Sequence, residues 1–280
     1  MPGSWNPIHE NHAIDAMAAL VTFSGTIPNL LLAKALKRSE DVAFDAGLRS
    51  RGGMAGFQMV IGAEGVSSGA TTQTRGRTFN SIIDDEETPL GSSRRVEQLV
   101  VTENQVAYRT WNYVSWTWQI ERMRMLMSPA ISMVQDAVSL ATQRLEYLDR
   151  FRYDGDLSEM QLTSLLRAGS PFVAPHVFSR TDLWHSYTGA FLPSNGGLKR
   201  LEQVHIDCLD EPSTPETTKT RWINIMTARE DRFIEPGVDE PAPNSNSIFD
   251  RFGLLHSELK DTFAGVITDE IARRIYLLES

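Results

Sequence analysis

One stretch of the chain, residues 108–127, constrains the fold more than any other because its aromatic residues take up a helical period. One set of apolar residues recurs at steps of three and four, which indicates a single helical face: Tyr113, Trp116, Ile120, Met123 and Met127. A second stripe contains Trp111, Val114, Trp118 and Met125. A helix with two apolar stripes is expected to pack against two different surfaces. The second stripe is therefore either buried between two layers of this chain or a partner surface centred on Trp111, Trp118 and Met125.

The segment that follows, residues 136–153, has the alternation of a long strand. Leu145, Tyr147, Phe151 and Tyr153 fall on one side, and the residues between them are mostly charged. This pattern predicts a strand of an antiparallel sheet with one partly solvated face. Asp149 and Arg150 point to opposite faces, so we expect one of them to need a buried partner. The predicted partner is a charge from Arg144 or Glu146, in an ion pair that stabilises the fold.

The remaining patterns complete a fold of class α+β: antiparallel sheets with packed helices in two similar lobes. We expect a buried strand over 15–23, a helix from Pro28, and a hairpin over 96–108. A second hairpin turns at residues 193–197, and a further strand spans 220–228. A long C-terminal helix begins near Ser247, breaks at Gly265, and resumes with Thr268 as a second cap.

The length of 280 residues fits one domain. We expect lobe one over about 1–155, a connector over about 154–184, and lobe two over about 185–280.

The net charge of the chain argues against nucleic acid as its main binding partner. Its formal net charge is −9, whereas binding along a phosphate backbone depends on clustered lysine and arginine. A local basic patch for nucleic acid or a nucleotide stays open as an alternative, formed by Arg49, Arg51, Arg75, Arg77 and Arg94. The acidic total favours the interpretation in which these arginines are solvated charges on loops and strand ends.

Cysteine usage and the N-terminus indicate the compartment. The single cysteine, Cys208, excludes an internal disulfide framework, which is typical of a reducing environment. The first residues show no basic region followed by an apolar core, and no apolar run reaches the length of a membrane span. We therefore expect a cytoplasmic protein that does not contact a membrane.

Two groups of residues contain side chains that could form chemical sites. His9 and His12 would begin a metal site only if a helix aligned them, and Pro7 disfavours that helix. His176, Asp182 and His185 would supply a general base with an orienting carboxylate, but no nucleophile or phosphate-binding motif accompanies them. We predict no metal, no cofactor and no catalytic residue, with a hydrolase centred on these histidines as the third hypothesis.

Three motifs together resemble a sporadically distributed, uncharacterised family of bacterial and archaeal proteins. They are Tyr113 with Trp116 before a helix, the strand end over residues 145–151 with Tyr147, Asp149 and Arg150, and the C-terminal run over residues 255–270. The family carries Asn where this chain has Asp149. The resemblance implies an accessory gene, such as a defence, toxin or regulatory module, and supplies no activity.

These observations lead to a functional hypothesis. We expect a non-enzymatic interaction or scaffold protein of an accessory system, with a protein partner or a second copy of itself bound at an apolar interface. Salt separates this hypothesis from nucleic-acid binding, because phosphate contacts weaken steeply as salt rises and apolar contacts persist.

Overall fold

The structure is a computed structural model that describes residues 3–53, 59–62, 65–68, 75–84, 93–193, 198–211, 220–233 and 245–277. The chain forms two compact units. Unit 1 comprises Met1–Ala18, Gln143–Asp239 and Asp250–Ser280, and unit 2 comprises Ala19–Thr142 and Glu240–Phe249. The residues expected to connect two lobes, 154–184, lie within unit 1, so the units have different boundaries from the lobes that the sequence predicts.

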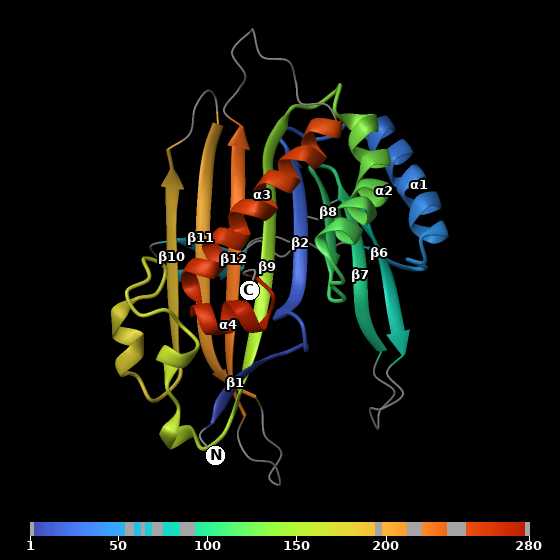
Figure 1. Ribbon diagram of the computed structural model, residues 1–280. Helices are drawn as coiled ribbons and strands as arrows, with labels where there is room; N and C mark the ends of the chain where they lie inside the picture. Colours follow the sequence, from blue (N-terminus) through green and yellow to red (C-terminus); the bar gives the residue numbers. More distant parts are fainter. Residues whose placement is uncertain are drawn as a thin grey trace. The chain divides into compact units, whose positions relative to one another are not determined.

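Unit 2 contains an antiparallel sheet and two helices. Its strands lie in the order β2, β8, β7, β6, β3, and the helices α1 and α2 pack against each other (Figure 1). The elements are β2 (Ile14–Phe23), α1 (Asn29–Asp45), β3 (Ser50–Gly53), β6 (Gly76–Asp84), β7 (Ser93–Thr102), β8 (Gln105–Thr110) and α2 (Trp116–Val134). Two further strands, β4 (Met59–Gly62) and β5 (Gly65–Ser68), pair with each other in a separate two-stranded sheet. Leu99 of β7 lies opposite Tyr108 of β8 and Phe79 of β6, and these three buried side chains form the centre of the sheet.

Unit 1 contains a second antiparallel arrangement. Its strands lie in the order β10, β11, β12, β9, and β1 pairs with β9. The elements are β1 (Ser4–Pro7), β9 (Leu140–Asp154), the short 3-10 helices η1 (Leu157–Glu159), η2 (Leu162–Ser164) and η3 (Pro175–Ser179), β10 (Trp184–Leu192), β11 (Leu198–Asp210), β12 (Arg221–Phe233), α3 (Ser245–Val266) and α4 (Asp269–Arg274). Figure 1 shows α3 lying across the strands of this unit. Strands β2 and β9 each contribute residues to both units.

The core of unit 1 joins the strands to α3, α4 and the segment between β9 and β10. Ile206 of β11 and Ile225 of β12 pack in the same cluster as Phe263 of α3. Leu165 and Val177, from the segment that the sequence assigns to a connector, are also fully buried there. This segment is therefore part of the hydrophobic core of its unit, because its apolar side chains cover one face of the sheet.

The predicted class, antiparallel sheet with packed helices, is confirmed. The strands over 15–23 and 136–153, the hairpin over 96–108 and the later strands are all present, with bounds shifted by a few residues. Thr268 caps α4 as predicted, since its side chain accepts a hydrogen bond from the backbone N–H of Ile271. Among the described residues, no helix combines the length and the apolar composition needed to cross a lipid bilayer.

The predicted start of helix α2 is wrong. Tyr113, Trp111 and Val114 precede α2 instead of lying on it, because Ser115 caps the helix by accepting a hydrogen bond from the backbone N–H of Trp118. In α3, Ser247 lies inside the helix, which begins at Ser245. The chain leaves the α3 helix at Val266, one residue after the predicted break at Gly265.

Candidate functional site

Helix α2 of unit 2 has one buried side and one exposed apolar side. Met123 and Met127 of the first stripe are fully buried. Trp118 of the second stripe keeps 44% of its surface exposed, and Val114 and Met125 are exposed as well. Because Trp118 and Met125 are two helical turns apart, they lie on the same side of α2. The second stripe is therefore a surface feature in this structure and is not buried between layers.

The buried side of α2 is fixed by a polar network. Arg122 donates from Nε and Nη2 to the two carboxylate oxygens of Glu97 in β7, each at 2.7 Å. The Tyr108 hydroxyl donates to Glu97 at 2.7 Å and accepts from the Gln119 amide at 2.7 Å. Burial, followed by the neighbouring Glu97 charge, raises the pKa of the Tyr108 hydroxyl. The hydroxyl therefore stays protonated and remains a donor to the carboxylate.

Arg122 also connects α2 with the end of α1. Its Nη2 donates to the carbonyl oxygen of Ala46 at 2.7 Å, and its guanidinium lies 5.8 Å from the centre of the Trp118 ring. Phe44, two residues before Ala46, is 53% exposed and lies 5.5 Å from the guanidinium of Arg49. A single arginine thus positions an exposed tryptophan while it holds the two helices together.

A third aromatic ring of unit 2 has the same kind of neighbour. The guanidinium of Arg95 lies 6.0 Å from the centre of the Trp111 ring, and the backbone N–H of Trp111 bonds to the carbonyl of Val96. Trp111 is half-buried and Arg95 is exposed. We call the whole set the aromatic–arginine surface, and it consists of Phe44, Trp111, Trp118, Met125, Arg49, Arg95 and Arg122.

The structure brings two of the five arginines of the predicted basic patch together at one carboxylate. Arg51 and Arg77 contact the same carboxylate, Glu40, at 2.5 and 3.0 Å. Arg75 pairs with Glu103 at 2.7 Å and also bonds to Asn29. Arg49 lies at Phe44, and Arg94 is exposed near the start of β7. Three of the five arginines therefore contact carboxylates of the same unit, and two of these three share Glu40.

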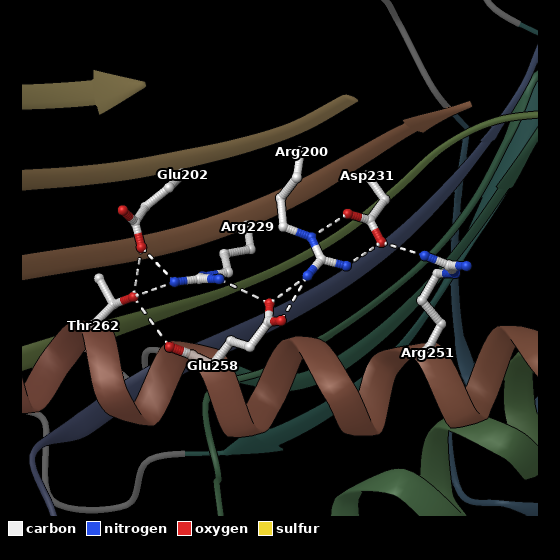
Figure 2. Close-up of polar contacts among 7 residues, drawn as sticks. All are labelled: Arg200, Glu202, Arg229, Asp231, Arg251, Glu258 and Thr262. Carbon is white, nitrogen blue, oxygen red and sulfur yellow. Dashed lines mark hydrogen bonds and ion pairs between the residues drawn. The ribbon is translucent and has the colours of Figure 1, made fainter. Parts of the chain in front are cut away.

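Unit 1 contains a larger charged network between α3 and the strands β11 and β12 (Figure 2). Asp231 accepts from Arg200 at 2.6 and 2.9 Å and from Arg251 at 2.7 Å. Glu258 of α3 accepts from Arg200 at 2.6 and 2.7 Å and from Arg229 at 2.8 Å. The row therefore alternates in sign, and it ends at Glu202. We call it the α3 network, and it consists of Arg251, Asp231, Arg200, Glu258, Arg229, Glu202 and Thr262.

Thr262 closes the end of this row. Its hydroxyl lies 2.7 Å from Glu202 and 3.0 Å from Arg229, and Arg229 reaches Glu202 at 2.5 Å. Asp231 and Glu202 are buried, and Arg200 and Arg229 are nearly so. Buried charges are tolerated when each meets an opposite charge with good geometry. The network thus docks α3 on the sheet, and sequence reasoning missed it.

The predicted ion pair of Asp149 is wrong. The Asp149 side chain is 2% exposed on the buried side of β9, and its Oδ1 atom has no hydrogen-bond partner among the described residues. Burial raises the pKa of this carboxyl well above its ordinary value. Arg144 instead pairs with Glu146 at 2.8 Å and with Glu230 at 3.6 Å. The predicted partners point to the opposite face, because they differ from Asp149 by an odd number of strand positions.

Arg150 and Tyr147, the other predicted motif residues of β9, both have partners. Arg150 lies 3.5 Å from Asp15, donates to Asn224 at 3.1 Å, and has its guanidinium 4.4 Å from the ring centre of Trp222. The Tyr147 hydroxyl is hydrogen-bonded to Nδ1 of His256 in α3 at 2.9 Å. Burial lowers the pKa of His256 to about 4, with Lys260 as the second cause.

The histidines of the two candidate chemical sites lie on different segments of unit 1. His176 is in η3, His185 is in β10 beside the Tyr187 ring, and Asp182 accepts a hydrogen bond from the backbone of Leu183. The rings of His9 and His12 have their centres 4.7 Å apart. In the part of the chain that the structure describes, no three or more His, Cys, Asp or Glu side chains are grouped as metal ligands. Cys208 is buried beside Arg221.

Comparisons with protein-family models, with curated proteins and with solved structures find no match to this chain. The contacts of its own side chains are therefore the basis for assigning a function.

Proposed function

We propose that this protein is a non-enzymatic binding protein and that the aromatic–arginine surface of unit 2 holds a protein partner. The observation that carries the proposal is the exposed Trp118 ring, which lies 5.8 Å from the guanidinium of the anchored Arg122. The same guanidinium bonds to the carbonyl of Ala46, two residues after the exposed ring of Phe44. Tryptophan and arginine are enriched among the residues that dominate interface energies, and aromatic side chains in general are enriched at interface cores.

The anchoring of Arg122 supports a surface that is ready to bind. Its two hydrogen bonds to Glu97 and one to Ala46 fix the guanidinium before any partner arrives. Side chains that are already ordered lose less conformational entropy on association. The bound partner would cover Trp118 and Phe44 at the centre, with Arg49 and Arg95 at the rim.

We propose the wider assignment on the same basis. The protein would act within an accessory system, as the family resemblance implies, and in the cytoplasm, as its single cysteine indicates. The two lobes would be similar in construction. This is supported by the strand order, since the first long strand lies beside the last strand of the meander in both units: β2 beside β8, and β9 beside β12. The long helix at the C-terminal end would then correspond to α2.

The test is an affinity purification from the native host at moderate salt, with three variants beside the wild-type chain. Trp118→Ala and Phe44→Ala remove the exposed rings, and Leu30→Ala is the control, because Leu30 is 68% exposed on α1 at the helix end distant from Phe44. A hot-spot truncation costs about 2 kcal/mol or more, which is roughly a 30-fold loss of affinity. We expect one protein to be recovered stoichiometrically with wild type and Leu30→Ala and to be lost with both ring variants.

Nucleic acid is the competing ligand, through Arg49, Arg94 and Arg95. Its signature would be bound nucleic acid that dissociates as salt is raised from 50 to 200 mM, where phosphate contacts weaken by orders of magnitude. Recovery of nucleic acid without a protein partner, or equal recovery of the partner with all four chains, would contradict the proposal.

A further inference from the structure

The edge strand of unit 1, β10, has an unusual composition for its position. It ends the strand order, with β11 on one side only. Its nine residues, Trp184–Leu192, include no aspartate, glutamate, lysine, arginine or proline. Soluble proteins usually protect an edge strand with charges, proline, a bulge or a short length, because its unpaired backbone groups attract other strands. β3, at the end of the order in unit 2, follows that rule with four residues that include Arg51.

Only the second half of β10 is open. Near its start, Trp184 and Ser186 are buried, η3 packs against the strand, and the Thr188 hydroxyl donates to the carbonyl of Phe172 at 3.3 Å. From Gly189 to Phe191 every residue is exposed, and Phe191 keeps 55% of its surface. Within the described part of the chain, the backbone bonds of β10 are those of its ladder with β11.

We propose that residues 188–192 of β10 pair, antiparallel, with the same residues of a second copy of this chain, about a two-fold axis at Ala190. In this register Ala190 meets Ala190 of the second copy, and Gly189 meets Phe191 of the second copy. The contact is isologous and closes as a dimer. It lies in unit 1 and does not depend on the aromatic–arginine surface.

Two features of the segment favour a second copy as the occupant. Antiparallel self-pairing of a charged strand would place like charges opposite each other, and this segment carries none. The side-chain sizes are also complementary. On each side of the axis Gly189 lies across from the ring of Phe191, and at the axis the small side chain of Ala190 allows the two strands to approach closely. An aromatic side chain across from a strand glycine covers the backbone that the glycine leaves bare. A ladder of five residues is a small contact, so the dimer is expected to be weak and concentration-dependent.

The test is the mass of the full chain in solution, measured by sedimentation velocity from about 5 to 500 µM, a range chosen for a weak interface. Wild type is expected to shift from the monomer mass of 31.4 kDa toward twice that value. Ala190→Lys and Ala190→Glu each place two like charges at the axis, so each variant alone should stay monomeric. An equimolar mixture of the two should regain the dimer, because opposite charges then face each other.

The control is Leu209→Lys, which adds the same charge at an exposed position of the neighbouring strand β11, away from the edge. It should dimerise like wild type. Circular dichroism establishes that each variant is folded. The proposal is overturned if wild type remains a monomer over the whole range, if Ala190→Lys dimerises as wild type does, or if the mixture of charged variants stays monomeric.

Discussion

Helix α2 of unit 2 and helix α3 of unit 1 both pack on antiparallel strands around buried charges, yet the charges are satisfied in different ways. In unit 2 one carboxylate, Glu97, receives one arginine and one neutral hydroxyl. In unit 1 three arginines and three carboxylates alternate in a row that includes residues from β11, β12 and α3. The polar contacts of α2 centre on one carboxylate, Glu97, whereas those of α3 extend along about three helical turns.

This difference assigns different roles to the arginines. All three arginines of the α3 network are bound to carboxylates, so the network determines how α3 lies along the strands. A row of alternating charges pairs well in one register only, and we take this as a hypothesis of specificity for the α3 dock. In unit 2, Arg122 holds Glu97 on its inner side and lies against Trp118 on its outer side. Unit 2 therefore retains an exposed aromatic side.

Removing Asp231 tests the row most severely. Asp231 is fully buried and contacts both Arg200 and Arg251, so Asp231→Ala removes the carboxylate that Arg251 contacts and one of the two that Arg200 contacts. Breaking a buried ion pair from one side costs about 3–5 kcal/mol of unfolding free energy. Urea denaturation would measure the loss, with the exposed Glu270→Ala as a control that should change stability by less than about 0.5 kcal/mol. A loss below about 1 kcal/mol would show that water compensates the arginines.

The corresponding change in unit 2 is expected to have a smaller effect. Glu97→Ala leaves Tyr108 without its acceptor, but Arg122 keeps the carbonyl of Ala46 and the ring of Trp118. We expect a loss of about 2–3 kcal/mol, in the range for unpaired buried polar groups. Urea denaturation of the two variants side by side measures the difference. If Glu97→Ala costs as much as Asp231→Ala, the distinction between a single anchor and a row is wrong.

The sequence predicts the strands of both units because their signal is local. The alternation over residues 145–153 and the apolar run over 15–23 each determine which side of one strand is buried. The hairpin over 96–108 follows from two strand patterns with Asn104 between them. These features require only neighbours in the chain, so a single sequence contains enough information to predict them.

The charged networks were not predicted because their partners are distant in the sequence. Arg200 pairs with Asp231, 31 residues on, and with Glu258, 58 residues on. A charged residue on a strand such as β11 is normally expected to face solvent. Without knowledge of its distant partners, the sequence gives no reason to place it in a buried ion pair. The start of α2 was misjudged for a local reason, since the helical spacing of Tyr113 outweighed the capping residue Ser115. The exposure of Trp118 depends on which side of α2 packs against the strands. The periodicity of the sequence does not decide between the two sides.

Acid should affect unit 1 before unit 2. All six histidines lie in the ranges of unit 1, and the pKa of His256 is lowered to about 4. The folded state therefore favours the neutral ring, so this contribution to stability is complete above the ordinary pKa of 6.5 and is lost as the pH falls toward 4. His256→Gln, which keeps a partner for Tyr147, should reduce the stability difference between pH 7.5 and pH 5 by about 1–2 kcal/mol after solvent screening.

Urea denaturation at the two pH values measures this effect, and His205→Gln is the control. The pKa of His205 is also lowered, chiefly by burial, but its ring is on the more open side of β11. Its substitution should therefore change the pH dependence less. An unchanged pH dependence in His256→Gln would show that the acid-sensitive group lies elsewhere.

The smallest expected effect concerns the two strands that each contribute residues to both units, β2 and β9. The buried residues of β2 in unit 2 are all apolar, namely Ala19, Val21 and Phe23, whereas β9 buries the carboxyl of Asp149. A raised folded pKa means that the contribution of Asp149 is favourable below its ordinary value of 3.8 and is lost as the pH rises through the folded value.

Asp149→Asn removes this charge and keeps the shape, but the new amide still has an unsatisfied buried atom. We therefore expect a gain of only about 1 kcal/mol at pH 7, disappearing near pH 4. Urea denaturation at both pH values measures the gain. An ion pair at Asp149 would give the opposite sign at pH 7, because the substitution would then leave a positive partner uncompensated.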